Sequence, residues 1–108
     1  RPESPMVARF TGSNVIDLDD APSLRAAFDV ESDDVVTIRP ESVTLGDDGD
    51  VRGTVERVVR EDATNRVTVS VDRVTIETFT ERTPAVGDEV WLTLPESDVH
   101  VCRQAATA

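Results

Sequence analysis

Valine, threonine and isoleucine together account for 33 of the 108 residues, and this abundance of β-branched side chains restricts the possible folds more than any other feature. Side chains that branch at Cβ lose rotamer freedom in a helix but pack well on the pleated, half-buried surface of a sheet. The sequence therefore predicts a domain built mostly of β-strands.

The strongest strand signal is an alternating run that leads into a tight turn. Valine takes every second position in the segment 66–71, and the same alternation resumes at Val74 and Ile76. Asp72 and Arg73 are the two residues that separate the runs. We therefore predict a β-hairpin with a two-residue loop at this place.

Phe79 lies out of step with the second strand of this hairpin. The alternation that begins at Val74 and Ile76 places the core face on even-numbered residues, whereas Phe79 has an odd number. Either a β-bulge near Thr78 or a phenylalanine on the outer face of the sheet would explain the mismatch. The sequence leaves both explanations open.

Further strands are predicted on both sides of the hairpin. In the segment 51–59, we expect Val51, Gly53, Val55 and Val59 to share one face. We also expect strands at 15–18, 35–38 and 89–94, a short helical turn at 6–10, an extended or weakly helical segment at 24–30, and turns at 46–50, 61–65 and 83–87.

Two segments, Ile38–Leu45 and Leu94–Val101, repeat the same turn chemistry. In each of them a strand ends at a proline, a Glu-Ser turn follows, and a new alternating strand begins. With these segments included, the chain has roughly six to eight short strands and no convincing long helix, a pattern typical of a small closed β-barrel. The expected fold class is all-β, as a small OB-like antiparallel barrel, closed or nearly closed, with short helical turns.

The charge of the chain makes nucleic acid an unsuitable partner. There are 22 acidic residues against 11 basic ones, all of them arginine, so the formal net charge is -11. Such a balance opposes binding to phosphate backbones and anionic lipids, and three Phe, one Trp and no Tyr offer few platforms for base stacking. An acidic surface without lysine suits concentrated salt, which screens the repulsion between carboxylates. We therefore expect a halophilic source.

The sequence offers no catalytic, metal-binding or cofactor-binding residues that we would single out. Cys102 is the sole cysteine, so neither an internal disulfide nor a paired-cysteine metal site can form, and a cytosolic compartment is expected. His100 is expected to be a partly buried strand residue rather than a general acid or base. The acidic segment 47–50 could bind Ca²⁺ weakly, but a solvated turn is the simpler interpretation. No apolar run reaches the length of about 18 residues that a membrane helix needs.

Trp91 is the one residue that we single out as a candidate for an interface. The alternation in the strand 89–94 assigns Val90, Leu92 and Leu94 to its core face. Trp91 is therefore expected on the opposite face. A lone tryptophan at such a place often anchors a contact with a partner. Covering one end of the barrel is the alternative.

Five short motifs follow one another in an order that resembles a known family. They are Val7-Ala8-Arg9-Phe10-Thr11-Gly12-Ser13-Asn14-Val15, Ile38-Arg39-Pro40-Glu41, Gly53-x-Val55, Gly87-Asp88-Glu89-Val90-Trp91-Leu92 and Asp98-Val99-His100-Val101. Together they resemble the transport-associated OB (TOBE) domain at the C-terminus of ABC-importer ATPase subunits. We expect the source of this chain to be a halophilic archaeon. The resemblance implies a linker at 1–5 from an upstream ATPase domain, a barrel domain at 6–102 and a tail at 103–108.

The resemblance also implies a non-catalytic regulatory and subunit-pairing function. The implied partner is a second copy of the same subunit, with a membrane permease reached indirectly through the ATPase domain that would bind ATP and Mg²⁺. The location would be cytoplasmic, peripheral to the inner face of the membrane. Modules of molybdate and tungstate importers resemble this domain too, which implies the alternative of an oxyanion sensor that binds ligand between paired domains. Their oxyanion stretch lies where this chain has Gly46–Asp50, whose carboxylates would disfavour a dianion.

Overall fold

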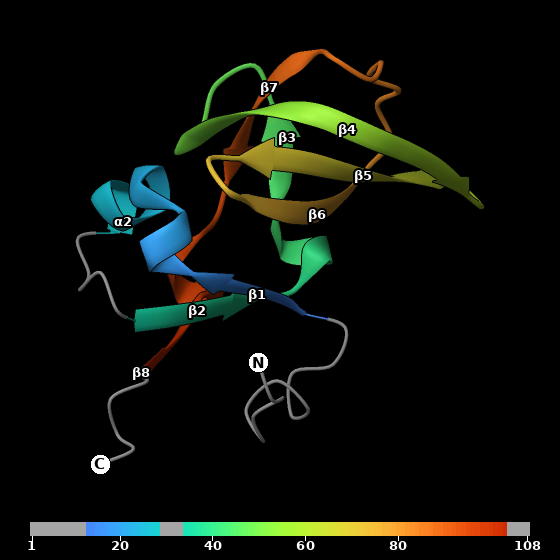
Figure 1. Ribbon diagram of the computed structural model, residues 1–108. Helices are drawn as coiled ribbons and strands as arrows, with labels where there is room; N and C mark the ends of the chain where they lie inside the picture. The colour runs from blue at the N-terminus through green and yellow to red at the C-terminus, as the bar shows by residue number, and fades with distance from the viewer. Residues whose placement is uncertain (1–12, 29–33, 104–108) are drawn as a thin grey trace, which may run out of the picture.

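The computed structural model describes residues 13–28 and 34–103, which form two antiparallel sheets and one short α-helix (Figure 1). One sheet has the order β1 (Asn14–Asp17), β2 (Asp34–Ile38), β8 (His100–Arg103). The other has the order β3 (Thr44–Gly46), β7 (Glu89–Thr93), β4 (Val51–Glu61), β5 (Thr64–Val71), β6 (Val74–Thr80). The helix is α2 (Pro22–Phe28), and 3₁₀ turns are η1 (Leu18–Asp20), η2 (Pro40–Ser42) and η3 (Glu96–Asp98).

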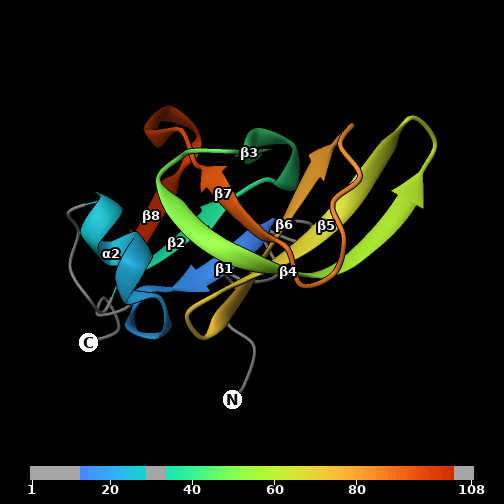
Figure 2. The same ribbon diagram turned by 90° about the horizontal axis from the view of Figure 1, so that it is seen from above.

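The three-stranded sheet lies against one side of the five-stranded sheet, and α2 and the β4–β5 turn lie at opposite ends of the molecule (Figures 1 and 2). The expected linker at 1–5, the helical turn at 6–10 and residues 104–108 of the expected tail lie outside the described residues. Within the described residues, no helix is long and apolar enough to cross a membrane.

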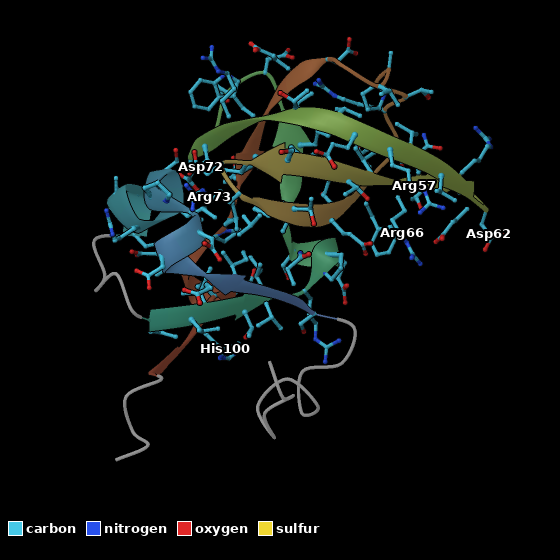
Figure 3. The ribbon with its side chains drawn as sticks, viewed as in Figure 1. Arg57, Asp62, Arg66, Asp72, Arg73 and His100 are labelled. Atoms are coloured by element: carbon cyan, nitrogen blue, oxygen red, sulfur yellow. The ribbon has the colours of Figure 1, made fainter. Side chains whose placement is uncertain are left out.

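The β5–β6 hairpin forms as predicted, with Asp72 and Arg73 between the paired residues Val71 and Val74. Asp72 has a positive φ of 53°, a conformation that aspartate tolerates better than most residues. Its carboxylate accepts hydrogen bonds from the backbone N–H of Ser23 (2.8 Å) and from the Ser23 hydroxyl (3.2 Å). The hairpin turn therefore satisfies a donor in the first turn of α2, beside which Figure 3 shows Asp72 and Arg73.

Phe79 lies on the outer face of the sheet, which is one of the two explanations that the sequence leaves open. No β-bulge displaces it. The β5–β6 register is regular, and Phe79 lies opposite Arg66. The Arg66 guanidinium is 5.7 Å from the centre of the Phe79 ring, a favourable cation–π distance. Thr78 is buried on the core face, where its hydroxyl donates a hydrogen bond of 2.6 Å to the backbone oxygen of Val43.

The prediction that Val59 shares the core face of β4 is wrong. A β-bulge between Val55 and Arg57 shifts the register, so that Val58 packs against the core and Val59 lies opposite Arg66 on the other face. The turn before β7 holds this bulge in place. Val55 donates to the backbone oxygen of Asp88 and accepts from the N–H of Gly87, each at 2.8 Å.

The core fills the space between the two sheets and the helix. Its predicted members on β5 and β7 are buried, as is the first residue of each repeated segment, Ile38 and Leu94. The buried core cluster consists of Ile16, Leu18, Ala21, Leu24, Val36, Ile38, Val43, Leu45, Val51, Val55, Val67, Val69, Val71, Ile76, Val90, Leu92 and Leu94.

The fold is all-β and OB-like as predicted, but strand pairing does not close the two sheets into one barrel within the described ranges. The buried side chain of Asn14 bridges them instead. The Asn14 amide donates to the backbone oxygen of Glu77 (3.0 Å) and accepts from its N–H (2.9 Å), in the way a neighbouring strand would. The Thr78 hydroxyl makes a different link: it connects β6 to Val43, the residue before β3, so it joins the two edges of the five-stranded sheet. Asn14 thus pairs part of the edge of β6 that would otherwise lack a partner.

Asn14→Ala is expected to lower the free energy of unfolding by about 2 kcal/mol, because both backbone groups of Glu77 lose their partner. Asn14→Asp keeps the acceptor but places a buried carboxylate against the backbone oxygen of Glu77, so its loss should be at least as large. Urea unfolding in molar KCl measures both variants. If Asn14→Ala is as stable as the wild type, the bridge between the sheets does not contribute to stability.

Candidate functional site

Trp91 lies on the outer face of β7, as the alternation of its neighbours predicts. Val90 and Leu92 are buried on the core face, whereas Trp91 is partly exposed and lies opposite Gly46 on β3 and Arg52 on β4. The most exposed large apolar side chains in the described part of the chain are Val86 (67%), Val101 (45%) and Val15 (38%). No contact in the structure tests the interface role of Trp91, which stays a prediction.

The acidic turn before β4 makes hydrogen bonds that support the fold. The Asp50 carboxylate accepts a hydrogen bond from the N–H of Leu94 (2.9 Å), and its own N–H donates to Leu92 (2.8 Å). A Cβ on Gly49 would lie 2.7 Å from the backbone oxygen of Leu92, so only glycine fits there. Among the described residues, no group of acidic, histidine or cysteine side chains could hold a metal ion.

The two repeated segments, which the sequence shows to be alike, meet at one pocket. The first contributes Ile38, Arg39 and Ser42 around η2, and the second contributes Ser97, Asp98 and His100 around η3. The pocket has a volume of about 270 Å³, and Ser13 and Thr37 complete its lining. Similarity of the segments was visible in the sequence, but their meeting depends on the pairing of β2 with β8.

His100 is exposed, so the expectation of a partly buried side chain is wrong. It lies opposite Thr37 in the β2–β8 register, and Figure 3 shows it on the side of the three-stranded sheet that faces away from the five-stranded sheet. β8 is an edge strand of its sheet, which leaves His100 open to solvent.

Thr37 is the residue of this pocket that sequence reasoning missed. It belongs to the middle strand of the sheet and is 1% exposed, yet within the described structure its hydroxyl has no hydrogen-bond partner. A buried hydroxyl without a partner costs about 1–3 kcal/mol. Such a group at the wall of a pocket is a candidate contact for a ligand.

Comparison with known proteins assigns the family. The model of the TOBE domain family matches residues 36–102, which include four of the five motifs noted in the sequence. No match was found among curated protein sequences.

A solved structure of ModG shows the same kind of fold, with a TM-score of 0.56 at 12% identity over 74% of this chain and 70% of that one. ModG is described as a cytoplasmic molybdate-binding protein with a cooperative binding mechanism, and that structure has molybdate bound. Because the TOBE match covers more than half of the sequence, this chain belongs to the TOBE domain family.

Proposed function

We propose that this chain is a non-catalytic regulatory and subunit-pairing domain of an ABC-importer ATPase subunit. The observation that carries the proposal is the TOBE match from β2 to β8, together with the Ile38-Arg39-Pro40-Glu41 motif that enters η2. ATP and Mg²⁺ would bind in a separate ATPase domain. That subunit would be cytoplasmic, peripheral to the membrane through a permease. The coding sequence around this chain tests the proposal, since it should encode a Walker A motif and an ABC signature upstream.

Pairing with a second copy follows from the same proposal. Pairs of identical subunits are commonly two-fold symmetric, so each copy presents the same surface to the other. Trp91 offers a partly exposed aromatic side chain on a rigid strand, flanked by the exposed ion pair between Arg52 and Glu89 (3.7 Å). Large aromatic side chains on such a scaffold supply much of the binding energy of interfaces.

Trp91→Ala is therefore expected to weaken self-association about tenfold or more, while the melting temperature changes little. Sedimentation velocity over a range of protein concentrations in molar KCl measures the association. Val86→Ala is the matched control, because it also removes apolar surface from an exposed position. A large loss of stability with unchanged association would instead make Trp91 part of the core.

A second candidate function is an oxyanion sensor that binds its ligand between paired domains. The observation in its favour is the likeness to ModG, whose structure has molybdate bound. Asp47 and Asp48, both exposed in the turn before β4, count against a dianion at that place. Isothermal titration with molybdate, tungstate and sulfate separates the two candidates. Heat of binding that saturates with molybdate or tungstate but not with sulfate would favour the sensor.

A further inference from the structure

We propose that the pocket between η2 and η3 binds a small zwitterion of the α-amino acid class. The pocket combines four hydroxyl side chains with one guanidinium, one carboxylate and the imidazole of His100, and its volume of about 270 Å³ suits a small ligand. The four hydroxyls belong to Ser13, Thr37, Ser42 and Ser97. Among the described residues, Ile38 is the only apolar one that lines it, so a hydrophobic ligand would find little surface to cover.

The two repeated turns each contribute a serine hydroxyl to the pocket, but they contribute opposite charges. Each Pro-Glu-Ser turn places its serine in the lining, Ser42 from η2 and Ser97 from η3. Arg39, however, comes from the first segment alone, and Asp98 from the second alone. A cationic side chain on one turn and an anionic one on the other suit a ligand whose two ends carry opposite charges.

Thr37 supplies the second line of evidence. Its side chain is almost wholly buried, lines the pocket and has no hydrogen-bond partner in the described structure. A hydroxyl can donate to a carboxylate, and Arg39 on the same strand end can neutralise that carboxylate. The ammonium end would then face Asp98 and the serine oxygens, which accept hydrogen bonds.

The same charges disfavour the simpler ligand classes. A dianion such as molybdate would meet the Asp98 carboxylate as well as the field of a chain with net charge -11. A simple cation would meet the Arg39 guanidinium, which repels it. A zwitterion satisfies both charged side chains at once. The biological role of the bound zwitterion rests on the proposed regulatory function. Binding of the zwitterion is a property of this chain alone.

The test is a ¹H–¹⁵N NMR titration of the chain in molar KCl with L-alanine, and in parallel with acetate, methylammonium and molybdate. L-alanine should bind at least about tenfold more tightly than acetate or methylammonium, a difference of about 1.4 kcal/mol. The shifts should centre on Thr37, Arg39, Ser97 and Asp98. Shifts at these residues caused by molybdate in preference to L-alanine would overturn the proposal, and so would the absence of any saturable shift with L-alanine.

Two substitutions separate ligand recognition from folding. Thr37→Val keeps the shape and removes the hydroxyl, so it should weaken L-alanine binding about tenfold without lowering the melting temperature. Asp98→Asn should remove the preference for L-alanine over acetate. Thr54→Val, on an exposed position of β4, is the matched control and should bind like the wild type. Unchanged affinity of a folded Thr37→Val variant would contradict the assignment, whatever the upstream coding sequence proves to be.

Discussion

Gly53→Ala is expected to lower the free energy of unfolding by about 3 kcal/mol, close to the upper end of what overpacking a core costs. Gly53 is buried on β4, and a Cβ there would lie 2.5 Å from the backbone oxygen of Ser70 and 2.5 Å from Cγ1 of Val69. The Ser70 oxygen belongs to the neighbouring strand and cannot rotate away. The two strands would have to separate, which would disturb the pairing at the centre of the five-stranded sheet.

Gly46→Ala is the matched control, because Gly46 is also in a strand of this sheet but a Cβ there would meet no clash. The nearest atom to a Cβ there, the backbone oxygen of Asp48, is 3.8 Å away, an ordinary contact. Its stability should stay within about 1 kcal/mol of the wild type. Urea unfolding in molar KCl measures both variants. Equal stabilities for the two variants would mean that β4 and β5 can separate at little cost.

The melting temperature is expected to rise by about 10 °C between dilute buffer and molar KCl, equivalent to about 2 kcal/mol for a domain of this size. Salt weakens attractive and repulsive charge interactions alike, so the sign depends on which of them dominates. The ion pairs of the described residues are Arg52–Glu89, Arg66–Glu61 and Arg82–Asp47. All are substantially exposed, and such pairs contribute about 0–1 kcal/mol each. Repulsion among 22 acidic residues therefore dominates, and screening it stabilises the compact state.

A charge-reduced variant provides the control for this salt effect. Glu56, Asp48 and Asp62 are exposed, and Glu56→Gln with Asp48→Asn and Asp62→Asn removes three negative charges. Asparagine also tolerates the positive φ of 47° at position 62. Thermal unfolding at several KCl concentrations should give this variant a smaller rise than the wild type. An equal melting temperature in dilute buffer and molar KCl would contradict the expectation of a halophilic protein.

Local patterns predicted the parts of the fold that depend on neighbours in the chain. The β5–β6 hairpin followed from the spacing of its valines and from a loop of two residues. The sequence places Val59 on the wrong face because the bulge in β4 depends on hydrogen bonds that Val55 donates to Asp88 and accepts from Gly87, more than 30 residues away. Of the expected closed or nearly closed barrel, full closure by strand pairing is absent from the described residues, since the side chain of Asn14 takes the place of a pairing strand at Glu77.

The candidate pocket could also be predicted only in part from the sequence. The repeated Pro-Glu-Ser turns were visible in the sequence and would have been the signal for a shared site. That they meet depends on the β2–β8 pairing, which joins segments about 60 residues apart. Thr37 gave no signal, because a threonine within an alternating valine-rich strand has an ordinary structural explanation. Only its burial without a partner sets it apart.

The proposal that this TOBE domain pairs with a second copy is tested most directly by sedimentation equilibrium of the wild-type chain in molar KCl. A single chain has a mass of 11.8 kDa. If the domain pairs, the weight-average mass rises with protein concentration toward twice this value and stops there, because a two-fold interface closes on itself. A mass that stays at one chain over the whole accessible concentration range would contradict the pairing function.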